Sequence, residues 1–242
     1  MTLLEVRGLD AGYGDFQALF GIDVTVTEGE TLAMIGANGA GKTTFLRVLA
    51  GQVPTRAGSI VFDGTDIAGV KAHRRVGLGI ALVPEGRMLF GSLTVRENLI
   101  IGAHAGRPGR WDLEAVLDVF PLIRPLLERP SHVLSGGEQQ AVAIGRALMS
   151  NPRLILLDEV SLGLAPVVVK SLYQALPALS EGGATVLLVE QDIGQALEVA
   201  SRLVCLLEGR VSLEGKPAEV PRSDITAAYF GLPAGSGSEA SS

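Results

Sequence analysis

Short apolar runs rich in Val, Ile and Leu recur along the chain and alternate with longer stretches of helical periodicity. An unbroken apolar run of this length is typical of a strand buried on both faces, and its alternation with helices is typical of a parallel sheet in an α/β core. We predict strands at Thr31–Ile35, Gly79–Val83, Leu154–Leu157, Thr185–Val189 and Leu203–Leu207. We predict helices at Lys42–Ala50, Gly136–Ser150, Pro166–Leu179 and Ile193–Ala200.

Three regions depart from this alternation. Near the start, Leu3–Arg7, Ile22–Thr27 and Ser59–Phe62 predict a smaller antiparallel sheet. Residues 94–128 show helical spacing without a strong strand pattern, which predicts a helical insertion over about residues 92–150. Residues 233–242 are mostly Gly, Ser and Ala, too small and polar to pack, so we expect a disordered tail after a single domain at residues 1–232.

Composition narrows the classes of partner. A formal net charge of −6 provides no overall positive field for nucleic acid or anionic lipid, so we expect no nucleic-acid partner. The basic cluster of Lys71, His73, Arg74 and Arg75 is expected to form a solvated helix face. The single Cys205 excludes an intramolecular disulfide, and the first ten residues lack a signal-peptide pattern, which favours a reducing compartment. No apolar run reaches the ~18 residues that cross a bilayer, so any membrane contact needs another protein.

A glycine-rich segment, Gly36–Thr43, lies between the first predicted core strand and the helix that follows it. Its sequence GANGAGKT matches the P-loop pattern in the context that the motif requires, which disfavours an accidental glycine-rich turn. The glycines let backbone N–H groups close around phosphates at a helix N-terminus. Lys42 is expected to reach the β and γ phosphates of a nucleotide, and Thr43 is expected to bind Mg²⁺. P-loops serve kinases and GTPases as well as ATPases, so the reaction stays open at this point.

Two further motifs concern the same chemistry. Asp158 and Glu159 end an apolar strand, where Asp158 is expected to hold Mg²⁺ and Glu159 to polarise the attacking water, although two acids after a strand can also simply begin a loop. Upstream, Ser135 and Glu138 form a capping box that starts a helix. The paired glycines between them weaken a helix and indicate that something approaches the backbone closely; an anion is the expected ligand.

The segment Leu134–Gln140, placed between the P-loop and Asp158–Glu159, resembles the signature of ATP-binding cassette ATPases. The resemblance covers about Leu3–Leu232 and implies that two cassettes pair head to tail, with the signature of one closing over the ATP held by the other. It also implies that Tyr13 stacks on adenine, the alternative being an ordinary surface or packed tyrosine. The implied ATP-binding residues are Tyr13, Gly36, Ala37, Asn38, Gly39, Ala40, Gly41, Lys42, Thr43, Thr44, Ser135, Gly136, Gly137 and Glu138.

The chain departs from the common cassette pattern at four positions. Glu85 stands where most cassettes have the Q-loop glutamine, and Gln191 stands where they have the switch histidine. Ala165 replaces the aspartate of the D-loop, and Val160 replaces a proline. By position, Glu85 and Gln191 take catalytic roles beside Glu159, and Glu85 joins Thr43 and Asp158 as a metal ligand. Since Gln cannot carry a proton as His does, we expect this site to hydrolyse ATP more slowly than a partner site with a complete histidine.

Three segments, Val83–Arg87, Ser161–Pro166 and Val189–Gln191, together resemble the LivF-type ATPases of branched-chain amino-acid importers, although Val160 stays outside that resemblance. The resemblance implies a LivG-type ATPase or a second copy as partner, two membrane permeases, a substrate-binding protein, and a place on the cytoplasmic face of the membrane. Glu85, Arg87 and Phe90 are candidates for permease contacts, the alternative for Phe90 being a core position. Importers of urea or short amides, exporters, soluble cassettes of DNA repair or translation, and regulatory proteins that trap ATP stay as alternatives.

Overall fold

The computed structural model describes residues 1–232, so the tail expected at 233–242 lies outside the described residues. The fold is α/β, with a mostly parallel sheet, an antiparallel sheet and helices, as predicted. The chain divides into two compact units. The first comprises Met1–Val70 and the chain from Leu187 onward, and the second comprises Lys71–Val186.

The antiparallel sheet of the first unit has the strand order β2-β1-β4-β5. It is larger than predicted, because β1 and β2 run on past the apolar segments that marked them and meet at a tight turn after Tyr13. Alternate residues of β1, such as Leu4 and Val6, are fully buried. The four strands are β1 (Thr2–Tyr13), β2 (Phe16–Thr27), β4 (Thr55–Phe62) and β5 (Thr65–Asp66).

The first unit also holds the strands that support the glycine-rich segment. Strand β3 (Thr31–Ile35) pairs in parallel with β9 (Arg202–Leu207), and β9 pairs antiparallel with β10 (Arg210–Gly215). The helices of this unit are α1 (Lys42–Leu49), α7 (Ile193–Val199) and α8 (Arg222–Phe230). Side chains of α7 and α8 pack on β3 and β9 in a core of Ala33, Ile35, Ala196, Leu203, Cys205 and Ile225. Strand β10 and helix α8 were not predicted.

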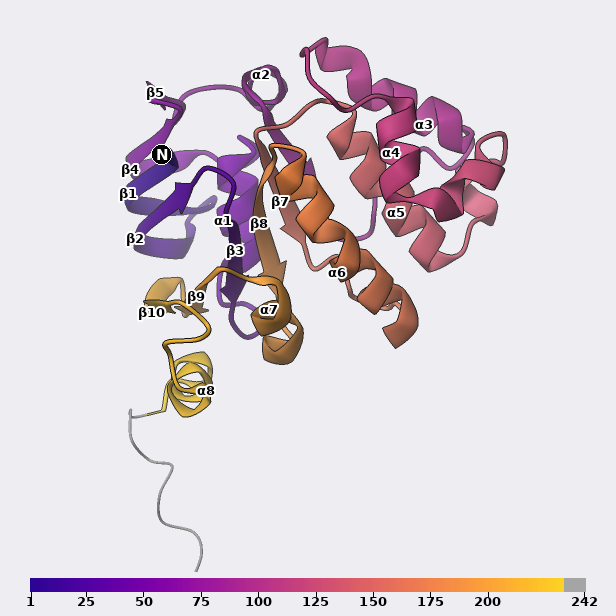
Figure 1. Cartoon of the computed structure of the whole chain (residues 1–242). Helices are drawn as coiled ribbons and strands as arrows, with labels where there is room; N and C mark the ends of the chain where they lie inside the picture. Colours follow the sequence, from indigo (N-terminus) through magenta and orange to yellow (C-terminus); the bar gives the residue numbers. More distant parts are fainter. Residues whose placement is uncertain (233–242) are drawn as a thin grey trace, which may run out of the picture. The chain divides into compact units, whose positions relative to one another are not determined.

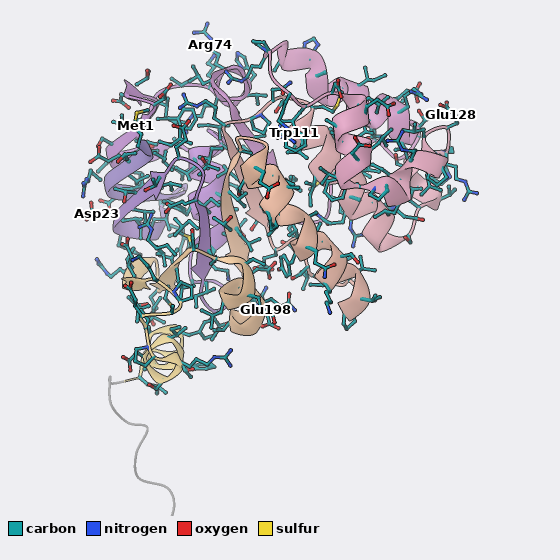
Figure 2. The ribbon with its side chains drawn as sticks, in the orientation of Figure 1. Met1, Asp23, Arg74, Trp111, Glu128 and Glu198 are labelled. Carbon is teal, nitrogen blue, oxygen red and sulfur yellow. The ribbon has the colours of Figure 1, made fainter. Side chains whose placement is uncertain are left out.

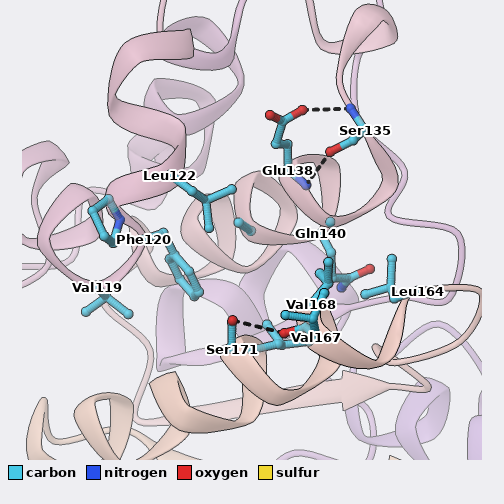
Figure 3. Close-up of a pocket in the computed structure, with 14 residues that line it drawn as sticks. Val119, Phe120, Leu122, Ser135, Glu138, Gln140, Leu164, Val167, Val168 and Ser171 are labelled. Carbon is cyan, nitrogen blue, oxygen red and sulfur yellow. Dashed lines mark hydrogen bonds between the residues drawn. The ribbon is translucent and has the colours of Figure 1, made fainter.

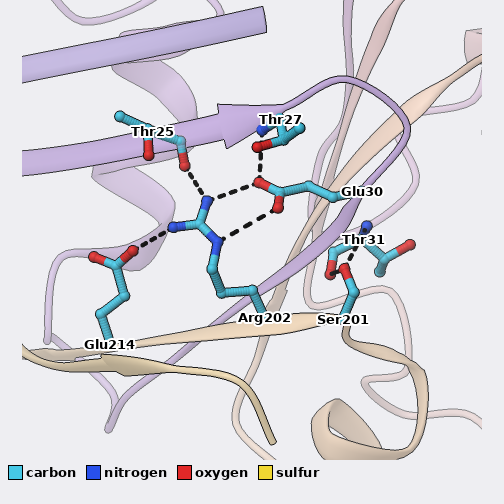
Figure 4. Close-up of polar contacts among 7 residues, drawn as sticks. All are labelled: Thr25, Thr27, Glu30, Thr31, Ser201, Arg202 and Glu214. Atoms are coloured by element: carbon cyan, nitrogen blue, oxygen red, sulfur yellow. Dashed lines mark hydrogen bonds and ion pairs between the residues drawn. The ribbon is translucent and has the colours of Figure 1, made fainter. Parts of the chain in front are cut away.

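An ion-pair cluster ties the turn after β2 to the start of β9 (Figure 4). Nη2 of Arg202 lies 2.7 Å from Oε1 of Glu30, and the same guanidinium donates to Glu214 and to the carbonyl oxygen of Thr25. The side chains of Arg202 and Glu30 are only 17% and 14% exposed. Because the backbone N–H of Thr27 also donates to Glu30, one carboxylate holds both the turn and the arginine.

The second unit is mainly helical around two parallel strands, β6 (Ile80–Val83) and β7 (Leu154–Asp158). Its helices are α2 (Ala72–Leu78), α3 (Val95–Gly102), α4 (Leu113–Val119), α5 (Gly136–Leu148) and α6 (Pro166–Glu181). Helices α3 and α4 lie against α5 (Figure 1). A Cβ at Gly145 would lie 2.7 Å from Val116 and 2.9 Å from Leu99, so this glycine lets both helices approach α5 closely. Strand β8 (Thr185–Glu190), buried throughout, carries the chain from this unit back into the first.

Two large side chains of the second unit are buried. Arg75, expected on a solvated helix face, is 2% exposed within α2, whereas its neighbours His73 and Arg74 are exposed. The expectation was wrong for Arg75 because the charge run does not show which face of a one- to two-turn helix packs inward. Trp111, labelled in Figure 2, is 4% exposed, and its ring would lie 2.1 Å from a Cβ at Gly182, so the indole fills the space beside the end of α6.

Candidate functional site

The glycine-rich segment Gly36–Thr43 follows β3 directly and opens α1, as predicted. Lys42 is the first residue of α1 and is 4% exposed. Its Nζ donates to the carbonyl oxygens of Gly36 at 2.7 Å and Ala37 at 3.2 Å, so the segment curls around the ammonium group. A cation is thereby fixed at the centre of a loop whose backbone surrounds it.

Glycine is required at both ends of this loop. A Cβ at Gly36 would lie 2.4 Å from the carbonyl oxygen of Leu206 on β9, which leaves no space for any other residue. Gly41 has φ +104°, a conformation that L side chains rarely adopt, and it precedes α1 without a side-chain cap. The first turn of α1 carries no acidic residue, so its backbone N–H groups and helix dipole favour an anion. The loop therefore fits a phosphate chain.

Gly209 supports the same loop and was not found from the sequence. Its backbone N–H donates to the carbonyl oxygen of Ala40 at 3.0 Å, and a Cβ here would lie 2.2 Å from the carbonyl oxygen of Ala18. Glu208 and Gly209 have φ +49° and +75° in the two-residue turn between β9 and β10. A Glu-Gly pair directly after an apolar run is the signal that could have predicted this turn.

Tyr13 and Gln191 lie in the same unit as the loop. Tyr13 ends β1, is 42% exposed, and pairs in register with Phe16, which is 69% exposed. Two exposed aromatic rings at the end of a hairpin suit stacking on a flat base. Gln191 follows β8 directly, and the next residue, Asp192, caps α7 by accepting from the N–H of Gln195 at 3.1 Å. The roles assigned to Tyr13 and Gln191 stay predictions.

The paired acids lie in the second unit. Asp158 is the last residue of β7 and is 2% exposed, while Glu159 follows with φ +47°. A non-glycine residue in this conformation is uncommon, and such residues cluster at functional sites. The carboxylate of Asp158 is a hard oxygen donor of the kind that Mg²⁺ takes. The hydroxyl of Thr43, in the first unit, is a donor of the same kind.

The capping box at the start of α5 forms as predicted (Figure 3). The N–H of Ser135 donates to Oε2 of Glu138 at 2.7 Å, and the N–H of Glu138 donates to Oγ of Ser135 at 3.4 Å. The close approach expected at the paired glycines is made at Gly137 by another side chain, since a Cβ there would lie 2.4 Å from Cγ1 of Val168. These glycines thus let α6 pack against the first turn of α5.

A cavity of about 520 Å³ lies beside this turn (Figure 3). Its walls are mostly apolar and come from the end of α4, the start of α5 and the start of α6. Of the residues lining it, Ser135, Gly137 and Glu138 belong to the signature segment. The start of α5 therefore forms part of the wall of this cavity.

Glu85 follows β6 in the segment 84–90 and is exposed. Phe90 is 52% exposed, with the guanidinium of Arg146 5.8 Å from its ring centre, so the alternative of a core position for Phe90 does not hold. Near this segment a second cavity of about 320 Å³ is lined by α2, β6, α3 and α5. Ile100 and Ile101 of α3 are 53% and 41% exposed, although isoleucine is usually buried.

The ABC transporter family model matches residues 19–161. The chain belongs to the ABC transporter family. It is 41% identical over 232 residues to the high-affinity branched-chain amino acid transport ATP-binding protein BraG of Pseudomonas aeruginosa, covering 95% of this chain and 100% of that protein. It is 33% identical over 221 residues to the probable branched-chain amino acid transport ATP-binding protein LivF of Archaeoglobus fulgidus, covering 90% and 94%. Among solved structures, the ABC cassette MJ0796 as a dimer bound to ADP and Pi is 26% identical with a TM-score of 0.78, covering 89% and 99%.

As a member of this family the chain binds ATP and hydrolyses it. The matched residues include the loop Gly36–Thr43, the signature segment and both acids, whereas Tyr13 and Gln191 lie outside the match. Within residues 1–232, no helix of the cassette combines the length and the apolar character that a membrane span needs. The structure brings the loop, Tyr13 and Gln191 into one unit, and Glu85, the acids and the signature into the other.

Proposed function

We propose that this cassette is the ATP-hydrolysing subunit of an importer for branched-chain amino acids, peripheral to the cytoplasmic face of the membrane. The proposal rests on the match to a relative named for high-affinity transport of these solutes. The match covers 95% of this chain and the full length of that relative. The resemblance of Glu85, Ala165 and Gln191 to the LivF-type pattern supports the same assignment. Importers of urea or short amides have a similar pattern, and they form the alternative that the experiment below separates.

ATP binds at the loop Gly36–Thr43 in this proposal. The backbone N–H groups at the start of α1 hold the phosphates, and Lys42 exchanges the carbonyl oxygens of Gly36 and Ala37 for oxygens of the β and γ phosphates. Thr43 and Asp158 would hold Mg²⁺, which would supply positive charge beside the phosphates. Glu159 orients and polarises the attacking water. Tyr13 stacks on the adenine, and Glu85 and Gln191 complete the polar surroundings of the γ-phosphate.

The ATP of this loop is closed by a second cassette, either a LivG-type ATPase or a second copy. The N–H groups and the hydroxyl of Ser135 at the start of α5 form an anion site in this proposal. The dimeric form of the similar cassette MJ0796 supports such pairing. In this arrangement each signature binds the γ-phosphate held by the other chain.

Two permeases contact the cassette at the segment 84–90 and the cavity of about 320 Å³ near it. The exposed side chains there are apolar or charged and come from different elements, as expected for a surface that receives a helix. The residues proposed to make this contact are Glu85, Arg87, Phe90, Ile100 and Ile101. A substrate-binding protein reaches the cassette only through the permeases. The solute is therefore chosen by the binding protein and the permeases, and the cassette does not select it.

The test is purification of the tagged cassette from its native membranes, followed by identification of the chains that accompany it and reconstitution of the complex in vesicles. We expect two permeases and ATP-dependent uptake of leucine. Uptake of urea or acetamide in place of leucine would select the alternative importer. Recovery of no permease would contradict the importer and favour a soluble cassette.

A further inference from the structure

The segment Arg87–Phe90 is held in an unusual backbone conformation. Arg87 and Met88 have φ +66° and +48°, two consecutive non-glycine residues in the left-handed region. Single residues visit this region in turns, and two in succession persist only where the surroundings fix them. The contacts of this segment therefore identify what it is attached to.

One attachment is Arg146 in the last turn of α5. Its Nη2 donates to the carbonyl oxygen of Arg87 at 3.1 Å and its Nη1 donates to that of Met88 at 2.8 Å. The same guanidinium faces the ring of Phe90. Burial lowers the pKa of Arg146, yet a guanidinium stays protonated in proteins. The planar fork of one arginine thus holds both strained peptide groups.

A second attachment is the buried pair Asn98 and Ser131, which are 0% and 1% exposed. Oδ1 of Asn98 accepts from the N–H of Phe90 at 3.0 Å, and its Nδ2 donates to Oγ of Ser131 at 2.8 Å. Ser131 lies four residues before the cap of α5. Buried, satisfied networks of this kind hold one arrangement of the chain because every broken bond leaves an unpaired polar group.

A third attachment runs from Arg87 through Gln139 to Ser131. Nη1 of Arg87 donates to Oε1 of Gln139 at 3.2 Å, and Nε2 of Gln139 donates to the carbonyl oxygen of Ser131 at 3.1 Å. A Cβ at Gly136 would lie 3.2 Å from Nη2 of Arg87, so the guanidinium rests on the glycine that opens α5. Gln139 and Arg146 are seven residues apart, which places them on one face of α5 about 10.5 Å apart along its axis. The segment Arg87–Phe90 is therefore hydrogen-bonded to α5 near both ends of that helix.

We infer that Arg87 is a positioning residue that joins the segment Arg87–Phe90 to the signature segment, so that the two move as one body. A displacement imposed on Phe90 or Arg87 from outside is passed to the first turn of α5 through Gln139 and Gly136 as well as through Asn98 and Ser131. The inference rests on the proposed role of that turn in closing over ATP. Arg87 touches no reacting atom in this scheme; it sets where Ser135 stands.

The experiment compares Arg87→Ala, Gln139→Ala and the double variant in the full chain, with Arg124→Ala as the matched control. Arg124 is an arginine of the same unit, paired with Glu114 and Asp118 on the surface. For each protein the kcat and KM of ATP hydrolysis, the Kd of a fluorescent ATP analogue, the Tm and the hydrogen exchange of residues 87–90 and 131–139 are measured.

We expect Arg87→Ala to lower kcat about tenfold with the Kd of the analogue within about twofold, and to raise the exchange of both segments together. The double variant should be no slower than the slower single variant, because both substitutions break one connection. The control should match the unaltered chain. The inference is overturned if exchange rises in one segment only, if the two kcat losses add, or if the loss of kcat merely follows a loss of Tm.

Hydrogen exchange separates this inference from the proposed role of the signature. If Ser135→Ala leaves ATP hydrolysis unchanged while Arg87→Ala still raises exchange in both segments, the signature proposal fails but the connection stands. If Ser135→Ala lowers hydrolysis and Arg87→Ala leaves both segments protected, the connection fails and the proposed function stands.

Discussion

Arg202 and Glu30 form an ion pair of 2.7 Å that joins residues 172 positions apart, and both side chains are mostly buried. Burial lowers the pKa of Arg202, but the hydrogen bond and charge of Glu30, with those of Glu214, more than offset this and leave the pKa raised. The guanidinium is therefore a permanent charge that depends on these partners. Removing one of them leaves part of that charge unpaired inside the fold.

Glu30→Gln should accordingly lower the free energy of unfolding by about 2 to 3 kcal/mol, since the neutral amide cannot balance the charge of the Arg202 guanidinium as the Glu30 carboxylate does. The measurement is urea denaturation followed by circular dichroism. Glu5→Gln is the control, because the Glu5–Arg7 pair is 41% and 59% exposed and exposed pairs contribute little, about 0.5 kcal/mol or less. Equal losses in the two variants would show that burial of the pair has no consequence.

Ser135→Ala should lower stability by about 1 kcal/mol through loss of the cap of α5, and should also lower kcat about tenfold or more if the hydroxyl contacts the partner's nucleotide. Asp112→Ala removes the cap of α4 in the same unit, where Oδ1 accepts from the N–H of Ala115 at 2.9 Å. The control should show a similar loss of stability with kcat unchanged. If kcat falls equally in Ser135→Ala and Asp112→Ala, the effect of Ser135 on hydrolysis comes from lost stability and not from contact with nucleotide.

The stability of the chain should decrease in alkaline solution through Cys205. Burial raises the pKa of this thiol, which is fully buried on β9, above its ordinary value, and the hydrogen bond of Ser212 and the charge of Lys42 offset this only in part. A thiol that stays neutral in the fold but ionises on unfolding stabilises the fold fully below the unfolded pKa of about 8.5, and this stabilisation is lost as pH rises toward the folded value. Cys205→Ala should flatten the dependence of unfolding free energy on pH above about 8.5, the unfolded pKa of the thiol. An unchanged slope would contradict the assignment.

Gln191 predicts unequal hydrolysis in a complex with two different cassettes. If the partner supplies a histidine at the corresponding position, Glu159→Gln in this chain should cost the complex less ATPase and transport than the equivalent change in the partner. One preorganised group is typically worth ~10² to 10³ in rate, which is enough to resolve the two sites. The measurement uses the reconstituted complex with each substitution in turn, and equal losses would remove the asymmetry.

Elements with a strong internal pattern could be predicted from the sequence, and those without it could not. The core strands β3 and β8 consist mainly of apolar residues, and their bounds agree with prediction to within one residue. Strand β10 alternates exposed and half-buried residues, and α8 buries only Ile225 and Ala227, so neither carries enough apolar periodicity to be recognised. The extension of β1 to Tyr13 was missed because Gly8 and the register shifts between Val6 and Leu9 interrupt its alternation.

The candidate site divides in the same way. The loop at Lys42, the capped start of α5 and the acids after β7 are contiguous motifs, so a linear sequence displays them whole. The contacts of Arg87 with Gln139 and of Arg146 with Met88 join residues more than 50 positions apart. Such pairs depend on how α5 lies against the segment after β6, which no local pattern encodes. Gly209 was missed for the same reason, because its partner Ala40 is distant in sequence.

The indole of Trp111 is the only one in the chain, and it fills the space beside Gly182 within the second unit. Its fluorescence therefore reports on the surroundings of α4 and α6. The unit that holds Lys42 contains no tryptophan of its own. A denaturation curve followed by tryptophan fluorescence reports one half of the cassette, and its comparison with circular dichroism tells whether the two halves melt together. If the fluorescence of Trp111 changes when ATP is added, then binding at the loop Gly36–Thr43 alters the surroundings of a residue in the other unit.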